Sequence, residues 1–283
     1  MSRRSSRRST RRWPRWSSRA RPTAFSSAGW ARARTTRWRA SSRSRPSRAE
    51  ARPVVTFSSF ILSAPYLDRF MDGVALTLVI ALAAWTIAVV LGLAMALVRD
   101  AGGVWCNRLV ALYVAYHRNV PALVHILLWY FGVSTLLPAS VQGWAVGHGG
   151  EAIFATIALG LCMSAYLCED VRSGLRATSA GQREAARSLG MGYFRMMRWV
   201  VLPQAVRTAL PSLVNDSVVL FKNTSMAMAI GVMETSYVIR EIENETFQTF
   251  EAYAIASALY LAGSLSIMAA GAAMARKFDI AAR

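Results

Sequence analysis

Five long apolar runs begin at residue 73, and they limit the possible folds of this chain more than any other feature. Residues 73–98 and 252–275 carry no charged side chain, and further apolar runs lie at 120–137, 152–171 and 208–232. A helix needs about 20 residues to cross the hydrocarbon core of a bilayer, and only helices or closed barrels can span it. The runs lack the alternation of barrel strands. The sequence therefore predicts an all-α membrane protein with five transmembrane helices.

The charge distribution separates a basic tail from a nearly neutral body. The chain has 283 residues, of which 54% are hydrophobic and 17% charged, too apolar for a soluble domain. The net charge of +18 is concentrated in residues 1–52, which hold 17 arginines and one acid, Glu50. The remaining residues, 53–283, hold 16 basic and 14 acidic side chains. We therefore expect no nucleic acid as a partner of the body, which we interpret as one transmembrane domain.

The tail, residues 1–52, contains no Leu, Val or Ile. Such a segment cannot bury enough apolar surface to offset its ordering entropy, so we expect it to be disordered. Its narrow alphabet is typical of an upstream region translated out of frame, and we expect it not to belong to the working protein. Two alternatives remain: an anchor for anionic lipid, or a nucleic-acid-binding segment on a membrane protein.

Basic residues gather in three segments that five spans would place on one side of the membrane. These segments are residues 99–118, residues 172–207 and the C-terminus after residue 275. The opposite segments differ, because 138–150 has no Lys or Arg and 233–250 has only Arg240. Since basic loops stay in the cytoplasm, the sequence predicts a multi-pass protein of the bacterial inner membrane with a cytoplasmic C-terminus.

The cytoplasmic segment 172–207 is too long to be a plain connection. Its pattern predicts a short helix, a glycine turn at Gly190 and Gly192, and a second short helix that ends near Pro203. We expect Glu184 near the N-terminus of the first helix, where the helix dipole favours a carboxylate. Ala185 and Ala186 would leave a smooth surface on which another protein can approach closely.

This segment resembles the signature of importer permeases of the ATP-binding-cassette superfamily. The matching residues have the family's spacing, with Val200 in place of Ile: they are Gly181, Gln182, Glu184, Ala185, Ala186, Gly190, Leu202 and Pro203. Gly181-Gln182 and the run from Lys222 to Ser225 are similar to permeases for polar amino acids. Arg118-Asn119-Val120-Pro121, followed by Trp129-Tyr130-Phe131, is similar to permeases for glutamate and aspartate.

The resemblance implies a type I importer fold and a set of partners. The permease pairs with itself or with a second permease, docks on a cytoplasmic ATP-binding subunit, and receives an amino acid from a periplasmic binding protein. The listed residues of segment 172–207 couple it to ATP hydrolysis in that subunit, which holds ATP and Mg. The chain has no GxxxxGK[ST] phosphate loop and no cysteine spacing typical of a metal site, so we expect no catalysis and no cofactor of its own.

Polar residues in the fourth predicted span are candidates for the translocation path, because polar groups inside a membrane helix face a cavity or a partner. Asn215 and Lys222 share one face, and Asp216 and Asn223 share the next; Thr224 and Ser225 follow. The alternative is polar packing between helices without contact with substrate. The acidic pair Glu169 and Asp170 is interpreted as salt-bridge partners of nearby arginines.

Two other transporter classes remain open on the sequence. A permease for another small solute would share the coupling signature. An ion-coupled secondary transporter would typically show internal repeats, and none is found here.

The charge pattern generates a topology prediction. A reporter fused after Arg283 should be active only in the cytoplasm, and one inserted near His148 only in the periplasm, because the basic segments stay inside. Paired alkaline phosphatase and fluorescent-protein fusions measure this. If both sites report the same side, the number of spans between them is even and the five-span map is wrong.

Overall fold

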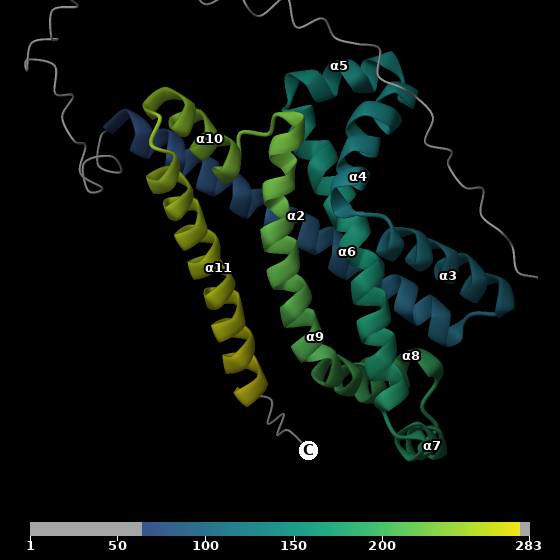
Figure 1. Cartoon of the computed structure of the whole chain (residues 1–283). Helices are drawn as coiled ribbons and strands as arrows, with labels where there is room; N and C mark the ends of the chain where they lie inside the picture. The colour runs from purple at the N-terminus through teal and green to yellow at the C-terminus, as the bar shows by residue number, and fades with distance from the viewer. Residues whose placement is uncertain (1–63, 278–283) are drawn as a thin grey trace, which may run out of the picture. The chain divides into compact units, whose positions relative to one another are not determined.

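Helices form the part of the chain that the computed structural model describes, residues 64–277, and no strand occurs within it. These residues fall in one compact unit bounded by Val55–Arg283. The predicted tail, 1–52, lies outside the described residues. The predicted all-α class is confirmed. The α-helices, labelled in Figure 1, are α2 Ala64–Ala101, α3 Val104–Asn119, α4 Ala122–Leu127, α5 Ala139–Gly147, α6 Gly150–Ala177, α7 Ala180–Ser188, α8 Tyr193–Met196, α9 Leu202–Asn223, α10 Thr235–Thr246 and α11 Thr249–Lys277.

Three of these helices are long and apolar enough to cross a membrane. They are α2 over Tyr66–Ala101, α6 and α11. They contain the predicted runs 73–98, 152–171 and 252–275. Three of the five predicted spans therefore coincide with helices of spanning length.

The predicted span 120–137 corresponds to only part of a bent element. Residues 104–119, expected to be part of a cytoplasmic segment, form α3, and α3 meets the limb Ala122–Leu136 at an angle of 106°. Val120 is extended at the bend because a residue that precedes proline avoids helical geometry. The limb continues from α4 through a π-helical turn, Leu128–Gly132, and a 3-10 turn, Val133–Leu136. At about 1.5 Å per residue it is too short to cross alone, so α3 and this limb count together as one candidate span.

The predicted span 208–232 lies on α9 and on the 3-10 segment Thr224–Ile230 that follows it. The helix begins earlier than expected, at Leu202, and ends at Asn223. Its polar side chains leave it outside the group of clearly apolar helices. The described residues thus contain three or four candidate spans by length and composition, and α9 as a fifth remains a prediction.

Helix α6 is the centre of the packing. It contacts α2, α3 and α9, while α11 packs on α9, and α10 packs on α2 and α11. Figure 1 shows α6 and α9 side by side, with α11 beyond α9. Of the apolar window of α6, 61% is buried, against 11% for α11. The exposed apolar side chains of α11 are therefore available to lipid or to a second membrane chain.

The α2–α6 contact depends on small residues that let the two backbones approach closely. A Cβ atom on Gly160 of α6 would lie 2.8 Å from Cβ of Ile87 and 3.1 Å from the carbonyl oxygen of Ala84. A Cβ on Gly92 of α2 would lie 2.7 Å from Leu167. There is no room for a side chain at Gly160 or Gly92, and a larger residue at either position would force α2 and α6 apart.

Gly160→Ala should lower the stability of the permease by about 1–3 kcal/mol, because the added methyl group forces the two helices apart. Gly143→Ala in α5 is the matched control, since nothing lies within 4 Å of a Cβ at Gly143. There, alanine should be neutral or slightly stabilising. Thermal unfolding in detergent, followed by retention of the monodisperse peak, measures both. Equal midpoints for the two variants would contradict the close-contact interpretation.

Candidate coupling element and polar path

The segment that carries the signature forms a helix pair that begins with α7. Gly181, Gln182, Glu184 and Ala185 are all exposed on α7, as is Gly190 after it. Ala186 is instead 3% exposed, so the expectation that it belongs to an open docking surface is wrong. Glu184 is the fifth residue of α7 and lies in its second turn, which corrects the expected position at the N-terminus.

The turn after α7 is a Schellman motif that depends on Gly190. The backbone N–H of Met191 donates to the carbonyl of Ala186 at 3.1 Å, and that of Gly190 donates to Arg187 at 2.9 Å. Gly190 has φ +73°, a left-handed conformation that glycine adopts without strain. Gly192 has φ −67°, so only one of the two predicted turn glycines is conformationally required.

The second helix of the pair does not end near Pro203. Helix α8 passes through a π-helical turn, Met197–Val201, directly into α9. Pro203 lies in the first turn of α9, where the missing N–H is tolerated. The predicted helix end is therefore wrong, and the coupling pair is joined without interruption to the helix that carries the candidate path.

Leu202 and Pro203 are set apart from the α7 surface. They line a cavity of about 330 Å³ with Val206, Leu210 and Met274, between α9 and α11. Their spacing along the chain alone predicted that they belong with the α7 residues. The structure assigns them to a different surface.

Large apolar side chains on the helix pair were missed by the sequence analysis. Leu189, Phe194 and Trp199 are 80%, 86% and 67% exposed, although they belong to a segment outside the apolar runs. Exposed apolar side chains beside a polar helix are typical of a protein–protein interface. Leu189 and Phe194 flank the glycine turn, and this position is the signal that could have identified them; Trp199 lies further on, in the π-helical turn.

An apolar cluster fixes the helix pair to the membrane helices. Ala186, Met196 and Val201 are buried together with residues of α2, α6 and α9, including Ala96, Leu175 and Ala205. The approach of α6 and α9 is close here, because a Cβ on Gly174 would lie 2.2 Å from the carbonyl oxygen of Ala205. The pair therefore packs as part of the helix bundle.

The predicted path residues of α9 divide into two groups. Asn215 and Lys222 are exposed, and they share a face as the seven-residue spacing predicts. Thr224 is fully buried and Ser225 is half-buried; their hydroxyls donate to the carbonyls of Phe221 and Lys222, each at 2.7 Å. Thr224 is thus buried in this structure, and its place on a path stays a prediction.

Asp216 and Asn223 are half-buried, and Asp216 faces α6. Its side chain is within hydrogen-bonding reach of Asp170, and Arg118 at the end of α3 interacts electrostatically with both carboxylates. Arg118 also lies 5.1 Å from the ring centre of Tyr166. Oδ2 of each aspartate is buried and receives no hydrogen bond from the described residues. Glu169, in contrast, pairs with Arg172, as expected from the sequence, and also with Arg99 of α2, which was not expected. Asp170 forms no salt bridge within residues 64–277, so the expectation of an ion pair is wrong for this residue.

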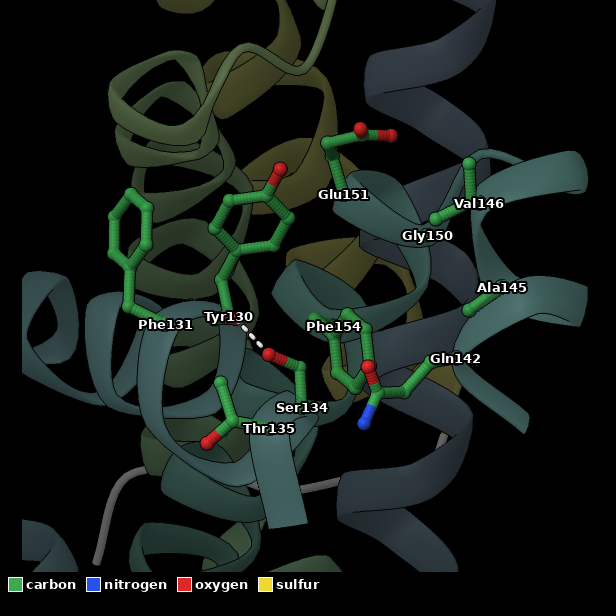
Figure 2. A pocket seen from close by; sticks show the side chains of 10 residues that line it. All are labelled: Tyr130, Phe131, Ser134, Thr135, Gln142, Ala145, Val146, Gly150, Glu151 and Phe154. Atoms are coloured by element: carbon green, nitrogen blue, oxygen red, sulfur yellow. Dashed lines mark hydrogen bonds between the residues drawn. The ribbon is translucent and has the colours of Figure 1, made fainter. Parts of the chain in front are cut away.

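A second cavity lies at the opposite end of α6 from the helix pair. Its volume is about 310 Å³, and it is lined by residues of the limb after α4, of α5 and of the first turns of α6. Figure 2 shows Tyr130 and Phe131 on one side and Gln142, Ala145 and Val146 on the other, with Phe154 between them. Glu151, in the first turn of α6, adds a carboxylate to this largely aromatic lining.

Glu234, the residue before α10, has a structural position. It is fully buried and caps α10, accepting from the backbone N–H groups of Ser236 at 2.9 Å and Tyr237 at 3.1 Å. It also accepts from the hydroxyls of Tyr260 at 2.9 Å and Thr77 at 3.4 Å. This carboxylate therefore joins α2, α10 and α11, and it does not line a cavity described above.

Comparison with known proteins agrees with this arrangement. The chain matches the family described as binding-protein-dependent transport system inner membrane component over residues 61–280. It is 33% identical over 192 residues to the octopine transport system permease protein OccM of Rhizobium radiobacter, covering 68% of this chain and 78% of that protein. It is 27% identical over 207 residues to the glutamate/aspartate import permease protein GltJ of Escherichia coli K12, covering 72% and 84%.

Among solved structures, the chain is similar to the crystal structure of an amino acid ABC transporter with histidines. The TM-score is 0.66 with 30% identity, and the match covers 77% of this chain and 98% of the other. The inward-facing MetNI methionine ABC transporter shares the fold, with a TM-score of 0.60 at 19% identity over 76% and 99% of the two chains. The chain therefore belongs to the family of binding-protein-dependent transport system inner membrane components, and it is a multi-pass, non-catalytic permease subunit of an ABC importer.

Proposed function

We propose that this permease carries a polar amino acid into the cytoplasm, with an acidic amino acid as the first candidate, and that the helix pair α7–α8 couples it to a partner ATPase. The observation that carries the proposal is the exposed α7 surface beside the Gly190 turn, flanked by Leu189 and Phe194. An exposed helix with apolar neighbours suits docking into a groove of another protein. Relatives that share the fold are named as amino-acid and opine permeases.

The coupling step follows from the continuity of the helices. ATP and Mg are held by the cytoplasmic partner, and closure of two such subunits displaces the α7–α8 pair as a rigid body. Because α8 continues through the π-helical turn into α9, the displacement carries Asn215, Asp216 and Lys222 with it. A second permease and a periplasmic binding protein complete the importer, with five spans and a cytoplasmic C-terminus. The two orientations form a bistable element that nucleotide binding biases.

The acidic candidate is supported by sequence, while Lys222 bears on binding of an amino-acid carboxylate in general. Lys222 presents an exposed ammonium group on α9, and a lysine there can neutralise a substrate carboxylate. The run from Arg118 to Pro121 resembles permeases for glutamate and aspartate, and the relative from Escherichia coli is named for those substrates.

A second candidate is a cationic amino acid or opine. The observation that favours it is the carboxylate pair Asp170 and Asp216, because the buried Oδ2 atom of each receives no hydrogen bond from residues 64–277. A guanidinium group presents several donors in a fixed geometry that suits carboxylates. The octopine permease of Rhizobium radiobacter is among the relatives.

A competition experiment separates the two candidates. Cells that contain the permease with its ATPase and binding protein should take up labelled glutamate or aspartate, and unlabelled acidic amino acids should compete at least about tenfold better than arginine. The expected reason is the resemblance of the run from Arg118 to Pro121 to permeases for glutamate and aspartate. Preferential competition by arginine or octopine would support the second candidate. Uptake of neither class would contradict both.

Gly190→Asp and Glu184→Lys should each abolish uptake while leaving the amount of permease in the membrane unchanged. Both change the charge of the docking surface without altering an apolar span, and Gly190→Asp also places a side chain at φ +73°. Gly103→Asp is the matched control, because Gly103 is exposed, has open space around it and precedes α3, where aspartate is a favoured cap. Uptake and immunodetection in membranes are the measurements. Normal uptake by either docking variant would show that this surface does not couple.

A further inference from the structure

The last turn of α2 holds Asp100, which connects this helix to the coupling pair. Asp100 accepts from Arg183 of α7, with Nη1 at 3.2 and 3.3 Å from its two carboxylate oxygens and Nη2 at 3.1 Å from Oδ1. This is a bidentate guanidinium–carboxylate contact, the strong and orientation-specific form of ion pair. The side chain of Arg183 is 26% exposed and that of Asp100 is 16% exposed, so the pair is shielded from solvent more than a typical surface ion pair.

Arg183 also contacts α6, since its Nη2 donates to the carbonyl oxygen of Leu175 at 3.2 Å. The residue before Asp100 extends the connection, because Arg99 pairs with Glu169 of α6. The two neighbouring charges at the end of α2 thus pair in different directions, Arg99 with α6 and Asp100 with α7. The end of α2 is held by charge to both elements.

Tyr193 at the start of α8 completes the group. Its hydroxyl donates to Oδ2 of Asp100 at 3.2 Å. Burial, followed by the neighbouring Asp100 carboxylate, raises the pKa of Tyr193 to about 12. The hydroxyl therefore stays protonated at neutral pH and remains a donor. Asp100 consequently holds both helices of the coupling pair, one through Arg183 and one through Tyr193.

Earlier turns of α2 contact the remaining helices of the bundle. The helix packs along α6 through Gly92 and Gly160, and Nε1 of Trp85 donates to Oγ of Ser217 on α9 at 3.0 Å. A displacement of the end of α2 is therefore transmitted to α6 and to the polar part of α9. The coupling pair has a covalent route to α9 through the π-helical turn and a non-covalent route through α2.

We propose that Asp100 is a positioning residue that transmits displacement of the coupling pair to α2, so that α2 and α9 move together when the partner ATPase closes. This inference rests on the coupling role proposed above for α7 and α8. It assigns to Asp100 no contact with ATP or with the transported amino acid. Loss of Asp100 should change the ratio of amino-acid import to ATP hydrolysis. The reason is that the covalent route would still move α9, while α2 would no longer move with it.

The test uses the complete importer, the permease with its ATPase and binding protein in proteoliposomes. Amino-acid import and ATP hydrolysis are measured in the same vesicles, and their ratio is the readout. Asp100→Asn removes the charge and keeps the shape, and it should lower the number of amino acids imported per ATP about tenfold. Tyr193→Phe, which removes one hydrogen bond only, should lower this ratio by a smaller factor. Asp72→Asn, an exposed aspartate at the other end of α2, is the matched control and should leave the ratio unchanged.

Charge exchange supplies a rescue. The double variant Asp100→Arg with Arg183→Asp should recover part of the ratio that each single change loses, because the ion pair is rebuilt with its direction reversed. If Asp100 had a merely structural role, its loss would lower import and hydrolysis by the same factor. An equal fall of both rates in Asp100→Asn and in Tyr193→Phe would therefore overturn the proposal. An unchanged ratio in Asp100→Asn would overturn it as well.

The proposed function fails separately from this inference. If the wild-type importer hydrolyses ATP without importing any amino acid, the assigned transport function is wrong, and the role of Asp100 falls with it. If the wild type imports and Gly190→Asp does not, while Asp100→Asn keeps the wild-type ratio, coupling through α7 stands and only the α2 route is overturned.

Discussion

The close contact between α2 and α6 is the constraint on which the rest of the described structure depends. Gly160 and Gly92 allow backbone and side chains to approach within distances that a Cβ atom would forbid. In a bilayer, apolar side chains gain little by leaving lipid for a helix interface, so packing at short range must hold the helices together. Because α6 also contacts α3 and α9, the position of each of these helices follows from the α2–α6 contact.

Polar side chains in this apolar chain have two distinct roles. Glu234 satisfies its carboxylate with four donors and joins three helices, which is a structural use of a buried charge. Asp170 and Asp216 bring two carboxylates together with Arg118 nearby, an arrangement that leaves acceptor capacity inside the bundle. A polar residue in a membrane helix is therefore not by itself evidence of a translocation path. The number of hydrogen-bond donors that each carboxylate meets distinguishes the structural Glu234 from the pair Asp170 and Asp216.

Apolar run length and the coupling signature were sufficient to predict the helical class, three of the spans and the exposed face of α7. Run length could not reveal the bend at Val120 and Pro121, because the arginines of 99–118 concealed an amphipathic helix. Spacing along the chain could not show that Ala186 is buried, because this depends on how the helix pair packs on the bundle. It also could not show that the chain stays helical through Met197–Val201, so that Pro203 lies in the first turn of α9. Spacing also could not show that the hydroxyl of Thr224 donates to the carbonyl of Phe221, one turn earlier in the chain.

The π-helical turn Met197–Val201 also sets an angular relationship. A π turn accommodates one more residue than an α turn, and each residue of an α-helix advances the side-chain direction by about 100°. The extra residue therefore determines the direction in which Asn215 and Lys222 project relative to the side chains of α8. Loss of one residue from this turn would leave α8 and α9 helical, but it would rotate the face of α9 that carries Asn215 and Lys222 toward a different neighbour. The length of this turn thus sets the rotation of α9 relative to α8. A change of one residue there would alter which neighbour the polar face of α9 contacts, while both helices remain folded.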